Sequence, residues 1–359
     1  MRILHLLLSL LFCTGLSAQD LKVIGTIDKT LKIPSGNHFG TKSIQQHIKL
    51  LKIQLSTAAL RTLIRRSKTS LSHPDFLQSA ADNLPTQVQL GMNDVPVLNQ
   101  GVFGSCVTFA TTGAIDAALG NGDYVSQVCQ LQLGKYLERN GYAPSGWEGS
   151  IGRLVLSQIE HFGIVNKQQQ AAGFCGLTEY PQESIATEEL SLENYHRVSQ
   201  NLEELGVYWS PVLDMLNAMS ERTDTNRTVN DIKLALNAKD RVTFGILLLD
   251  LDLGLMGAVG THHVNFDTWV LTPEIARDIY LHPLFGGHEM IITGYDDEAV
   301  AKDEQGHEHK GLFTLRNSWG NQFGDRGDFY MSYDYFKILV IEAQRIRNFA
   351  INGDSDSDD

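Results

Sequence analysis

The sequence predicts an α+β protein of two lobes, because helix-like and strand-like segments fall in different parts of the chain. In the first part, apolar residues recur at three- and four-residue spacing and indicate helices near residues 106–119, 126–140 and 151–162. In the last part, short apolar runs predict strands at Val242–Leu249, Met290–Gly294, Leu312–Arg316 and Asp328–Ser332. Between them, residues 176–240 are mostly polar and helical in character. The 359 residues suffice for one large domain or two modest ones.

The N-terminal region is expected to form a small hairpin followed by one long helix. Residues 21–33 place Val, Ile and Leu on both sides of an Asp28-Lys29 turn. A helix is expected from Thr41 or Ser43 to Arg66, because the apolar residues there form a stripe at helical spacing. Residues 67–85 are polar and contain two prolines, which is typical of a linker or a cleavage region.

The charge of the chain is divided unevenly. The net charge of −13, without a basic stripe that carries aromatic residues, argues against nucleic acid as a partner. Residues 19–82 carry 10 Lys and Arg against 4 Asp and Glu, whereas residues 83–359 carry 18 against 38. A basic N-terminal segment and an acidic main region could attract each other. An independent small domain with a solvated basic helix is the alternative.

Residues 1–18 have the composition of a secretory signal peptide. Arg2 precedes an apolar run from Ile3 to Phe12, and Leu16-Ser17-Ala18 precedes Gln19. The run is too short to span a bilayer, and no later stretch is long and apolar enough to do so. We therefore expect a secreted protein without a membrane partner, in an extracellular, periplasmic or lysosome-like compartment. The acidic tail, residues 353–359, is expected to be disordered.

Removal of the signal peptide would leave three cysteines, Cys106, Cys129 and Cys175. In an oxidising compartment an odd number indicates one disulfide and one free, reactive thiol. Cys129 with Cys175 is the economical pairing; the alternative is that all three are reduced.

Cys106 stands where a helix is expected to begin. Ser105 is a candidate N-cap, and it would place Cys106 in the first helical turn. Unpaired backbone N–H groups and the positive end of the helix dipole favour a thiolate there, which suits a nucleophile. A buried structural cysteine is the alternative.

Two later segments accompany this cysteine. In chain order the sequence has Gln100 and Cys106, then His288 leading into a strand that ends at Gly294-Tyr295, then Asn317-Ser318-Trp319-Gly320. This order resembles that of the papain-like cysteine peptidases, over about residues 84–332, and is specific at residues 97–110, 288–295 and 315–327. The resemblance implies a two-lobed papain-like fold, in which a mainly helical lobe carries the Cys helix and a β-rich lobe carries His and Asn. The N-terminal hairpin and helix would be an additional segment.

The resemblance also implies a role for each residue of the motif. Cys106 would be the nucleophile, and His288 would form a thiolate–imidazolium pair with it and later protonate the leaving amine. Asn317 would orient the imidazole, and Trp319 would shield their hydrogen bond from water. Gln100 would supply one donor of the oxyanion hole, beside the backbone N–H of Cys106.

Other positions match or depart from the family pattern. Gly149 and Ser150 occupy the place of a Gly-Gly pair that binds the substrate backbone. Glu289 replaces a small residue that lines a specificity pocket, so it would favour a basic substrate side chain or narrow the pocket; a surface-facing Glu289 is the alternative. Phe103 replaces a cysteine, so packing must hold this loop in place of a disulfide, and Val107 replaces an aromatic residue.

Together these observations predict a secreted cysteine peptidase made as a zymogen. Residues 19–82 would be a propeptide or inhibitory N-terminal domain and residues 83–352 the peptidase domain. The expected partners are a peptide or protein substrate and, as an intramolecular inhibitor, the chain's own N-terminal segment. The sequence lacks the spaced Glu, Arg, Phe and Asn pattern of the family's propeptides, so this blockade is inferred from position and charge.

Two other functions compete with this one. A catalytically weak papain-fold protein could bind peptides or act as a scaffold, which Phe103 and Val107 favour. Transglutaminase-like acyl transfer normally orients its histidine with Asp, and the Asn-Ser-Trp-Gly motif argues against it. No cofactor or metal is expected, because surface or loop positions are the simpler reading of the histidines at residues 262–263 and 307–309.

Overall fold

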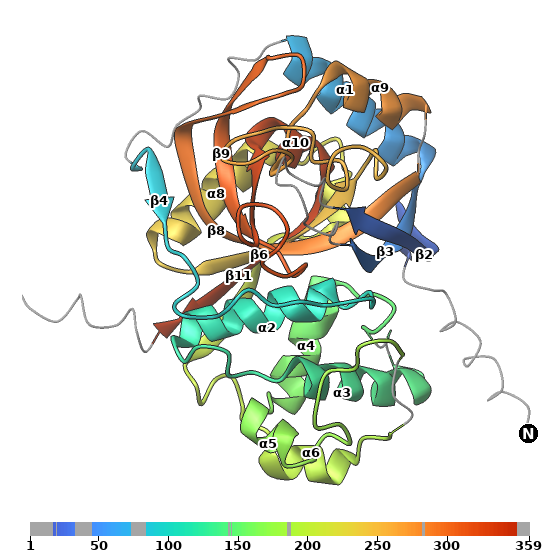
Figure 1. The fold of residues 1–359 in the computed structure, drawn as a ribbon, viewed down its shortest axis with the longest axis vertical. Coiled ribbons are helices and arrows are strands. Elements are labelled where there is room, and N and C mark those ends of the chain that lie inside the picture. The colour runs from blue at the N-terminus through green and yellow to red at the C-terminus, as the bar shows by residue number, and fades with distance from the viewer. Residues whose placement is uncertain are drawn as a thin grey trace, which may run out of the picture.

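The computed structural model describes residues 17–18, 20–32, 45–72, 84–142, 144, 146–184, 188–281 and 284–349. It confirms the two-lobed α+β fold class (Figure 1). One lobe is helical and consists of α2 (Cys106–Leu119), α3 (Gln127–Arg139), α4 (Gly152–Phe162), α5 (Lys167–Ala171) and α6 (Leu192–Val198). The helices expected near residues 106–119, 126–140 and 151–162 are therefore confirmed. The other lobe contains most of the strands.

The β-rich lobe is organised around β8 (Leu284–Lys302), which pairs antiparallel with strands on both sides. The main path of the sheet is β1-β2-β3-β8-β6-β11-β5, with β4, β7, β9 and β10 attached beside it. The strands outside the N-terminal region are β4 (Gln87–Gln89), β5 (Val207–Leu213), β6 (Arg241–Leu248), β7 (Thr268–Trp269), β9 (Glu308–Arg316), β10 (Asp328–Ser332) and β11 (Val340–Asn348). The four expected strands are confirmed, and β5 appears within the region expected to be helical.

Helices α7 (Met215–Ala218), α8 (Thr225–Asn237), α9 (Pro273–Leu281) and α10 (Tyr333–Leu339) complete this lobe. With α1 (Thr57–Ser72), three of them form a connected layer, in which α1 contacts α9 and α10, and α10 contacts α8. Figure 1 shows α1 and α9 side by side at the end of the molecule opposite the helical lobe.

The N-terminal region differs from the prediction in two ways. Residues 21–33 do not form a hairpin by themselves: β2 (Leu21–Lys32) runs straight through Asp28-Lys29 and pairs with β3 (Gln45–Leu55). Where a helix was expected from residue 41 or 43, the described chain forms a strand from Gln45 to Leu55, and α1 begins only at Thr57. Apolar residues at both spacings allow either structure here, and pairing with β2 and β8 selects the strand.

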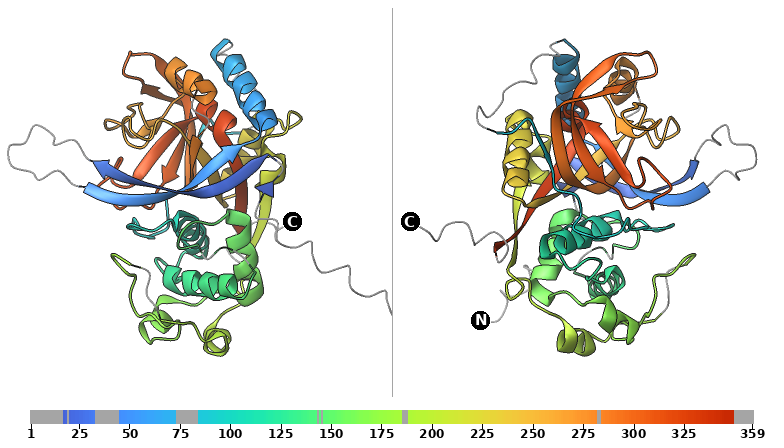
Figure 2. Two further views of the ribbon diagram at one scale, coloured as in Figure 1. Left: turned by 90° about the vertical axis from the view of Figure 1, so that its right-hand side faces the viewer. Right: turned by 60° about the vertical axis from the view of Figure 1, so that its left-hand side comes forward.

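This region shares its hydrophobic core with the β-rich lobe. Buried residues of β2, β3 and α1 belong to one cluster with Phe244, Ile292 and Phe336: Leu21, Leu31, Ile48, Leu50, Ile53, Ala59 and Leu63. The view on the left of Figure 2 shows β2 and β3 lying between the two lobes. An independently packed N-terminal domain is therefore not what the structure shows.

Several predicted segments lie outside the described residues. They include residues 1–16 of the expected signal peptide, residue 19 after it, residues 73–83 of the expected linker, and the acidic tail. Ser17–Ala18 form the short strand β1, which pairs with β2, and the first residues of the expected linker belong to α1. Among the described helices, none is long and apolar enough to cross a membrane.

The shared core predicts how a substitution in β3 changes the stability of the protein. Leu50 of β3 is fully buried, and its side chain packs on Gly286 of β8. Leu50→Ala should lower the free energy of unfolding of the whole described fold by about 2–5 kcal/mol, because it leaves a cavity in the common core. Urea unfolding followed by fluorescence measures this change. Leu71→Ala, at a position that is 44% exposed, is the control; an unchanged main transition in Leu50→Ala would contradict a shared core.

Candidate active site

Cys106 is the first residue of α2, as predicted, and only 4% of it is exposed. Ser105 occupies the N-cap position, but its side chain makes no capping hydrogen bond in the described structure. Its hydroxyl instead lies 2.8 Å from the hydroxyl of Tyr180. The backbone N–H groups at the start of α2 remain available to an anion beside Cys106.

The imidazole of His288 is held from two directions. Its Nε2 lies 2.9 Å from Oδ1 of Asn317, and an amide oxygen can only accept, so Nε2 carries the proton of this bond. Trp319 stacks on the ring, with centroids 4.7 Å apart and planes 23° from parallel. His288 Nδ1 is buried and has no hydrogen-bond partner within the described part of the chain. In the neutral ring this nitrogen is a free proton acceptor.

Asn317 is fixed in turn by its own loop. The backbone N–H of Ser318 donates to Asn317 Oδ1 at 2.7 Å, and the N–H of Asn317 donates to the carbonyl of Gly327 at 3.1 Å. Both Asn317 and Trp319 are buried. Water therefore has little access to the His288–Asn317 bond, which strengthens it.

Gln100 connects the loop before Cys106, residues 100–105 (the cysteine loop), to the lobe that carries His288. Its backbone N–H donates to the carbonyl of Ser318, and its Oε1 accepts from the hydroxyl of Ser318, each at 2.8 Å. Its Nε2 donates to the carbonyl of Phe103 at 2.8 Å. The amide nitrogen carries a second hydrogen, which leaves it one further donor.

Cys106 and His288 line the same cavity, together with Ser150 and Glu289. The structure thus brings together residues from the start of α2, from the turn before α4 and from β8. Gly149 adjoins this cavity, with a positive φ of 136°, which favours glycine. The sequence-predicted residues Gly149, Ser150 and Glu289 therefore lie next to the candidate nucleophile.

Burial keeps both members of the Cys–His pair neutral in this conformation. Burial raises the pKa of Cys106 to about 12, although the backbone N–H groups of Glu289 and Val107 oppose the shift. Burial also lowers the pKa of His288 to about 4, against the opposing effect of its bond to Asn317. At neutral pH this buried site therefore holds the Cys106 thiol and a neutral His288 imidazole.

Packing of aromatic rings holds the loop around Phe103, as expected from the missing cysteine. The Phe103 ring meets Trp147 edge-on at 5.0 Å and Tyr180 edge-on at 5.7 Å. Val107 is buried and lines the same cavity as Cys106.

Glu289 is buried, so the alternative of a surface-facing side chain is wrong. Glu342 of β11 is a second buried carboxylate that lines this cavity, and the sequence analysis did not identify it. Glu342 accepts from the N–H of Gly152 at 2.9 Å, at the start of α4. Burial and the neighbouring Glu342 raise the pKa of Glu289 well above its usual value. Burial raises the pKa of Glu342 as well, although the backbone N–H groups of Gly152 and Arg153 oppose that shift.

The N-terminal strand β3 covers the cavity. Leu51 pairs with Gly287, the residue before His288, and its side chain fills the space that a Cβ at Gly149 would need. Leu51 and Ile53 line the cavity from this side. An ion pair of 2.5 Å joins Lys49 to Glu148, beside Gly149. β3 therefore contacts both lobes on either side of the candidate nucleophile.

The remaining cysteines and histidines lie elsewhere. Cys129 and Cys175 form a disulfide, and Cys106 is the free cysteine among those described, as the economical pairing predicts. His263 contacts Asp325 at 2.8 Å, and His307 contacts Asp303 at 3.0 Å. Within the described ranges, no group of three or more His, Cys, Asp or Glu side chains is arranged to hold a metal ion.

Comparison with known proteins gives distant structural neighbours only. No family model and no curated protein matches the sequence. The neighbours are papain-like cysteine proteases. Xylellain, from Xylella fastidiosa, is 18% identical, with 76% of this chain and 89% of that chain covered and a TM-score of 0.48. Digestive procathepsin L 3 of Tenebrio molitor is 17% identical, with 75% and 72% covered and a TM-score of 0.42.

The bromelain protease from Ananas comosus, in complex with the E64 inhibitor, is 15% identical, with 74% of this chain and 99% of that chain covered and a TM-score of 0.43. Identities and TM-scores this low assign no role to any residue. The chemical function therefore depends on the side-chain geometry described above.

The pKa of Cys106 makes a prediction for its reactivity. Iodoacetamide should alkylate Cys106 of the intact chain far more slowly than free cysteine at pH 7.5, because little thiolate is present. The rate should keep rising about tenfold per pH unit up to pH 10, since the pKa is about 12. Mass spectrometry of the labelled peptide measures the rate, and Cys106→Ala is the control. A rate that levels off below pH 7 would show a thiolate in the covered site and contradict this description.

Proposed function

We propose that this chain is a cysteine peptidase in a latent form, which hydrolyses peptide bonds through Cys106, His288 and Asn317. The observation that supports it best is the state of His288: Nε2 is engaged by Asn317, and Nδ1 is unpartnered in the described structure. Since Cys106 lines the same cavity, this nitrogen is the base available to its thiol. Orientation by Asn317 also fits this chemistry better than transglutaminase-like acyl transfer.

In the proposed reaction the Cys106 thiol gives its proton to His288 Nδ1, and the thiolate attacks the peptide carbonyl carbon. The oxyanion that forms is stabilised by Gln100 Nε2 and by the backbone N–H of Cys106. The imidazolium then protonates the leaving amine as the C–N bond breaks, which leaves a thioester. Water, deprotonated by His288, hydrolyses the thioester and restores the thiol.

The N-terminal segment is the proposed intramolecular inhibitor. Leu51 occupies the space between Gly149 and Gly287, where a substrate would have to lie. Charge complementarity supports the same role, because ion pairs join Lys49 to Glu148 and Lys29 to Asp252.

We also infer export through the signal peptide at residues 1–18. Cleavage before Gln19 would remove β1, which pairs with the adjoining part of β2.

The antiparallel pair of β2 and β3 forms the N-terminal hairpin. Opening this hairpin should therefore activate the protein. The opened variant, Lys49→Glu with Leu51→Asn, places like charges opposite each other at Glu148 and leaves a buried amide over the cavity. It should hydrolyse a fluorogenic peptide library at least tenfold faster than the wild type. Adding Cys106→Ala should abolish that activity and the labelling by an epoxysuccinyl inhibitor.

A matched control makes the same charge reversal and a similar aliphatic-to-Asn change elsewhere on the hairpin. Lys52→Glu with Ile24→Asn alters side chains that do not line the cavity, so it should leave the activity at the wild-type level. An opened variant that folds but neither hydrolyses peptides nor reacts with the inhibitor would favour the alternative, a catalytically weak peptide-binding or scaffold protein.

The cavity also supports the proposed preference for a basic substrate side chain. Among the described residues, no Lys or Arg forms an ion pair with Glu289 or Glu342, so a substrate cation could supply the missing charge. We expect the opened variant to cleave a peptide with Arg at the position that enters this cavity at least tenfold faster than its Leu counterpart. Glu289→Gln should reduce this ratio, measured as kcat/KM. A clear preference for Leu would exclude the basic-subsite proposal.

A further inference from the structure

The hydroxyl of Tyr180 connects the two functional ends of the cysteine loop. It donates to the backbone carbonyl of Gln100 at 2.8 Å. Its oxygen lies 2.8 Å from the hydroxyl of Ser105, the residue before the nucleophile. Since the single proton of Tyr180 is directed at Gln100, the Ser105 hydroxyl is the donor of the second bond. One oxygen atom thus bridges the candidate oxyanion-hole residue and the start of α2.

The ring of Tyr180 is held in a cluster of aromatic residues. It meets Phe109 of α2 edge-on at 5.2 Å and Phe103 edge-on at 5.7 Å. Trp147 lies against it at 5.7 Å, with its plane tilted by 31°. These contacts restrict the ring and thereby define where the hydroxyl lies.

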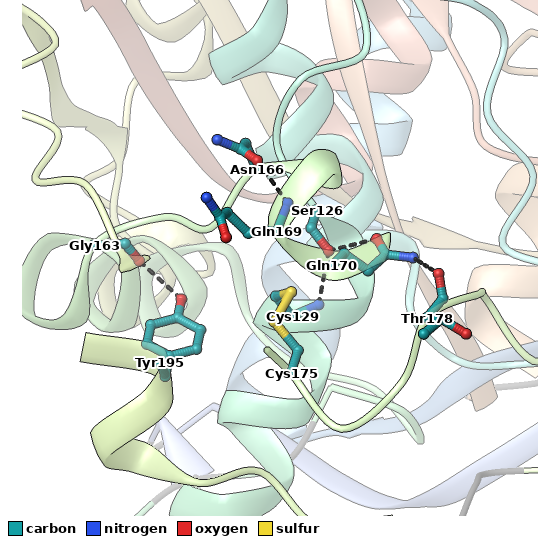
Figure 3. Close-up of a disulfide and its surroundings, with 9 residues drawn as sticks. All are labelled: Ser126, Cys129, Gly163, Asn166, Gln169, Gln170, Cys175, Thr178 and Tyr195. Atoms are coloured by element: carbon teal, nitrogen blue, oxygen red, sulfur yellow. Dashed lines mark hydrogen bonds between the residues drawn. A yellow bond between two sulfur atoms is a disulfide. The ribbon is translucent and has the colours of Figure 1, made fainter. Parts of the chain in front are cut away.

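The segment that carries Tyr180 is anchored independently of the cysteine loop (Figure 3). The disulfide joins Cys175, five residues earlier, to Cys129 of α3. Gln170 then donates to the carbonyl of Thr178 at 2.9 Å, and Ser126 donates to Gln170 Oε1 at 2.7 Å. The disulfide and this pair of hydrogen bonds tie the segment to the beginning of α3.

The loop from Gln100 to Ser105 needs such support because it contains two glycines. Gly101 has a positive φ of 58°, and Gly104 lies so close to the backbone of Glu148 that a Cβ would clash at 2.6 Å. From the other lobe, only Ser318 is seen to bind Gln100 among the described residues. Tyr180 is the corresponding contact from the helical lobe.

We propose that Tyr180 is a positioning residue that sets the oxyanion hole, by holding Gln100 and the start of α2 at a constant separation. This proposal rests on the proposed peptidase function. An oxyanion-hole donor must lie within a few tenths of an ångström of its place to stabilise the transition state. The Cys129–Cys175 disulfide would act in the same chain of contacts, because it fixes the segment on which Tyr180 stands.

The test compares two reactions of Cys106 in the opened variant. Peptide hydrolysis passes through an oxyanion, whereas alkylation by iodoacetamide is a direct displacement at carbon and forms none. Tyr180→Phe keeps the ring and removes only the hydroxyl. It should lower kcat for peptide hydrolysis by about 10- to 100-fold with little change in KM, and it should leave the alkylation rate unchanged.

Tyr195→Phe is the matched control. Tyr195 is buried near the same disulfide, and its hydroxyl donates to the carbonyl of Gly163 at 2.9 Å (Figure 3). Removing this hydroxyl should leave both reactions unchanged. If Tyr180→Phe does not fold, Ser105→Ala removes one of the two bonds of the same hydroxyl and should separate the two rates in the same direction.

Each outcome bears on a defined claim. An unchanged kcat in Tyr180→Phe, or equal losses of hydrolysis and alkylation, would overturn the positioning role while leaving the peptidase function intact. Absence of hydrolysis in the opened parent itself would instead overturn the proposed function. A selective loss of kcat in Tyr180→Phe, absent from Tyr195→Phe, supports the proposal.

Discussion

The pairing of β3 with the Gly286-Gly287 end of β8 is the contact on which the rest of the structure depends. It extends the sheet of the β-rich lobe by the N-terminal hairpin and buries the apolar side of that hairpin in the common core. Because the next residue of β8 is His288, the same pairing brings the hairpin over the candidate active site. Stability of the fold and coverage of the site are therefore coupled.

This coupling gives a physical basis for latency. Because Cys106 and His288 are buried, the neutral thiol and imidazole are favoured over the charged pair that a peptidase needs. Leu51 also occupies the space between the lobes. Steric exclusion and desolvation then act together, and displacement of β3 would relieve both.

Much of the candidate site could be predicted from the sequence, because Cys106, His288 and Asn317 each stand in a short motif with its own local signal. Glu342 and Tyr180 could not be found in this way. Glu342 reaches the cavity only because β11 pairs with β6, and Tyr180 binds residues 75 and 80 positions away. Contacts between distant segments leave no periodicity in the sequence. The strand at residues 45–55 was missed for a different reason: its apolar residues fit helical as well as strand spacing, and pairing with β2 and β8 selects the strand.

Hydrogen–deuterium exchange before and after covalent labelling of Cys106 tests the central claim most directly. An epoxysuccinyl inhibitor on Cys106 and β3 on Gly287 require the same space, so they should exclude each other. We predict that the amides of β3 lose protection in the labelled protein, while those of the β9–β10 pair keep it. Protection of β3 that is unchanged in fully labelled protein would contradict the account, because the hairpin would not cover the active site.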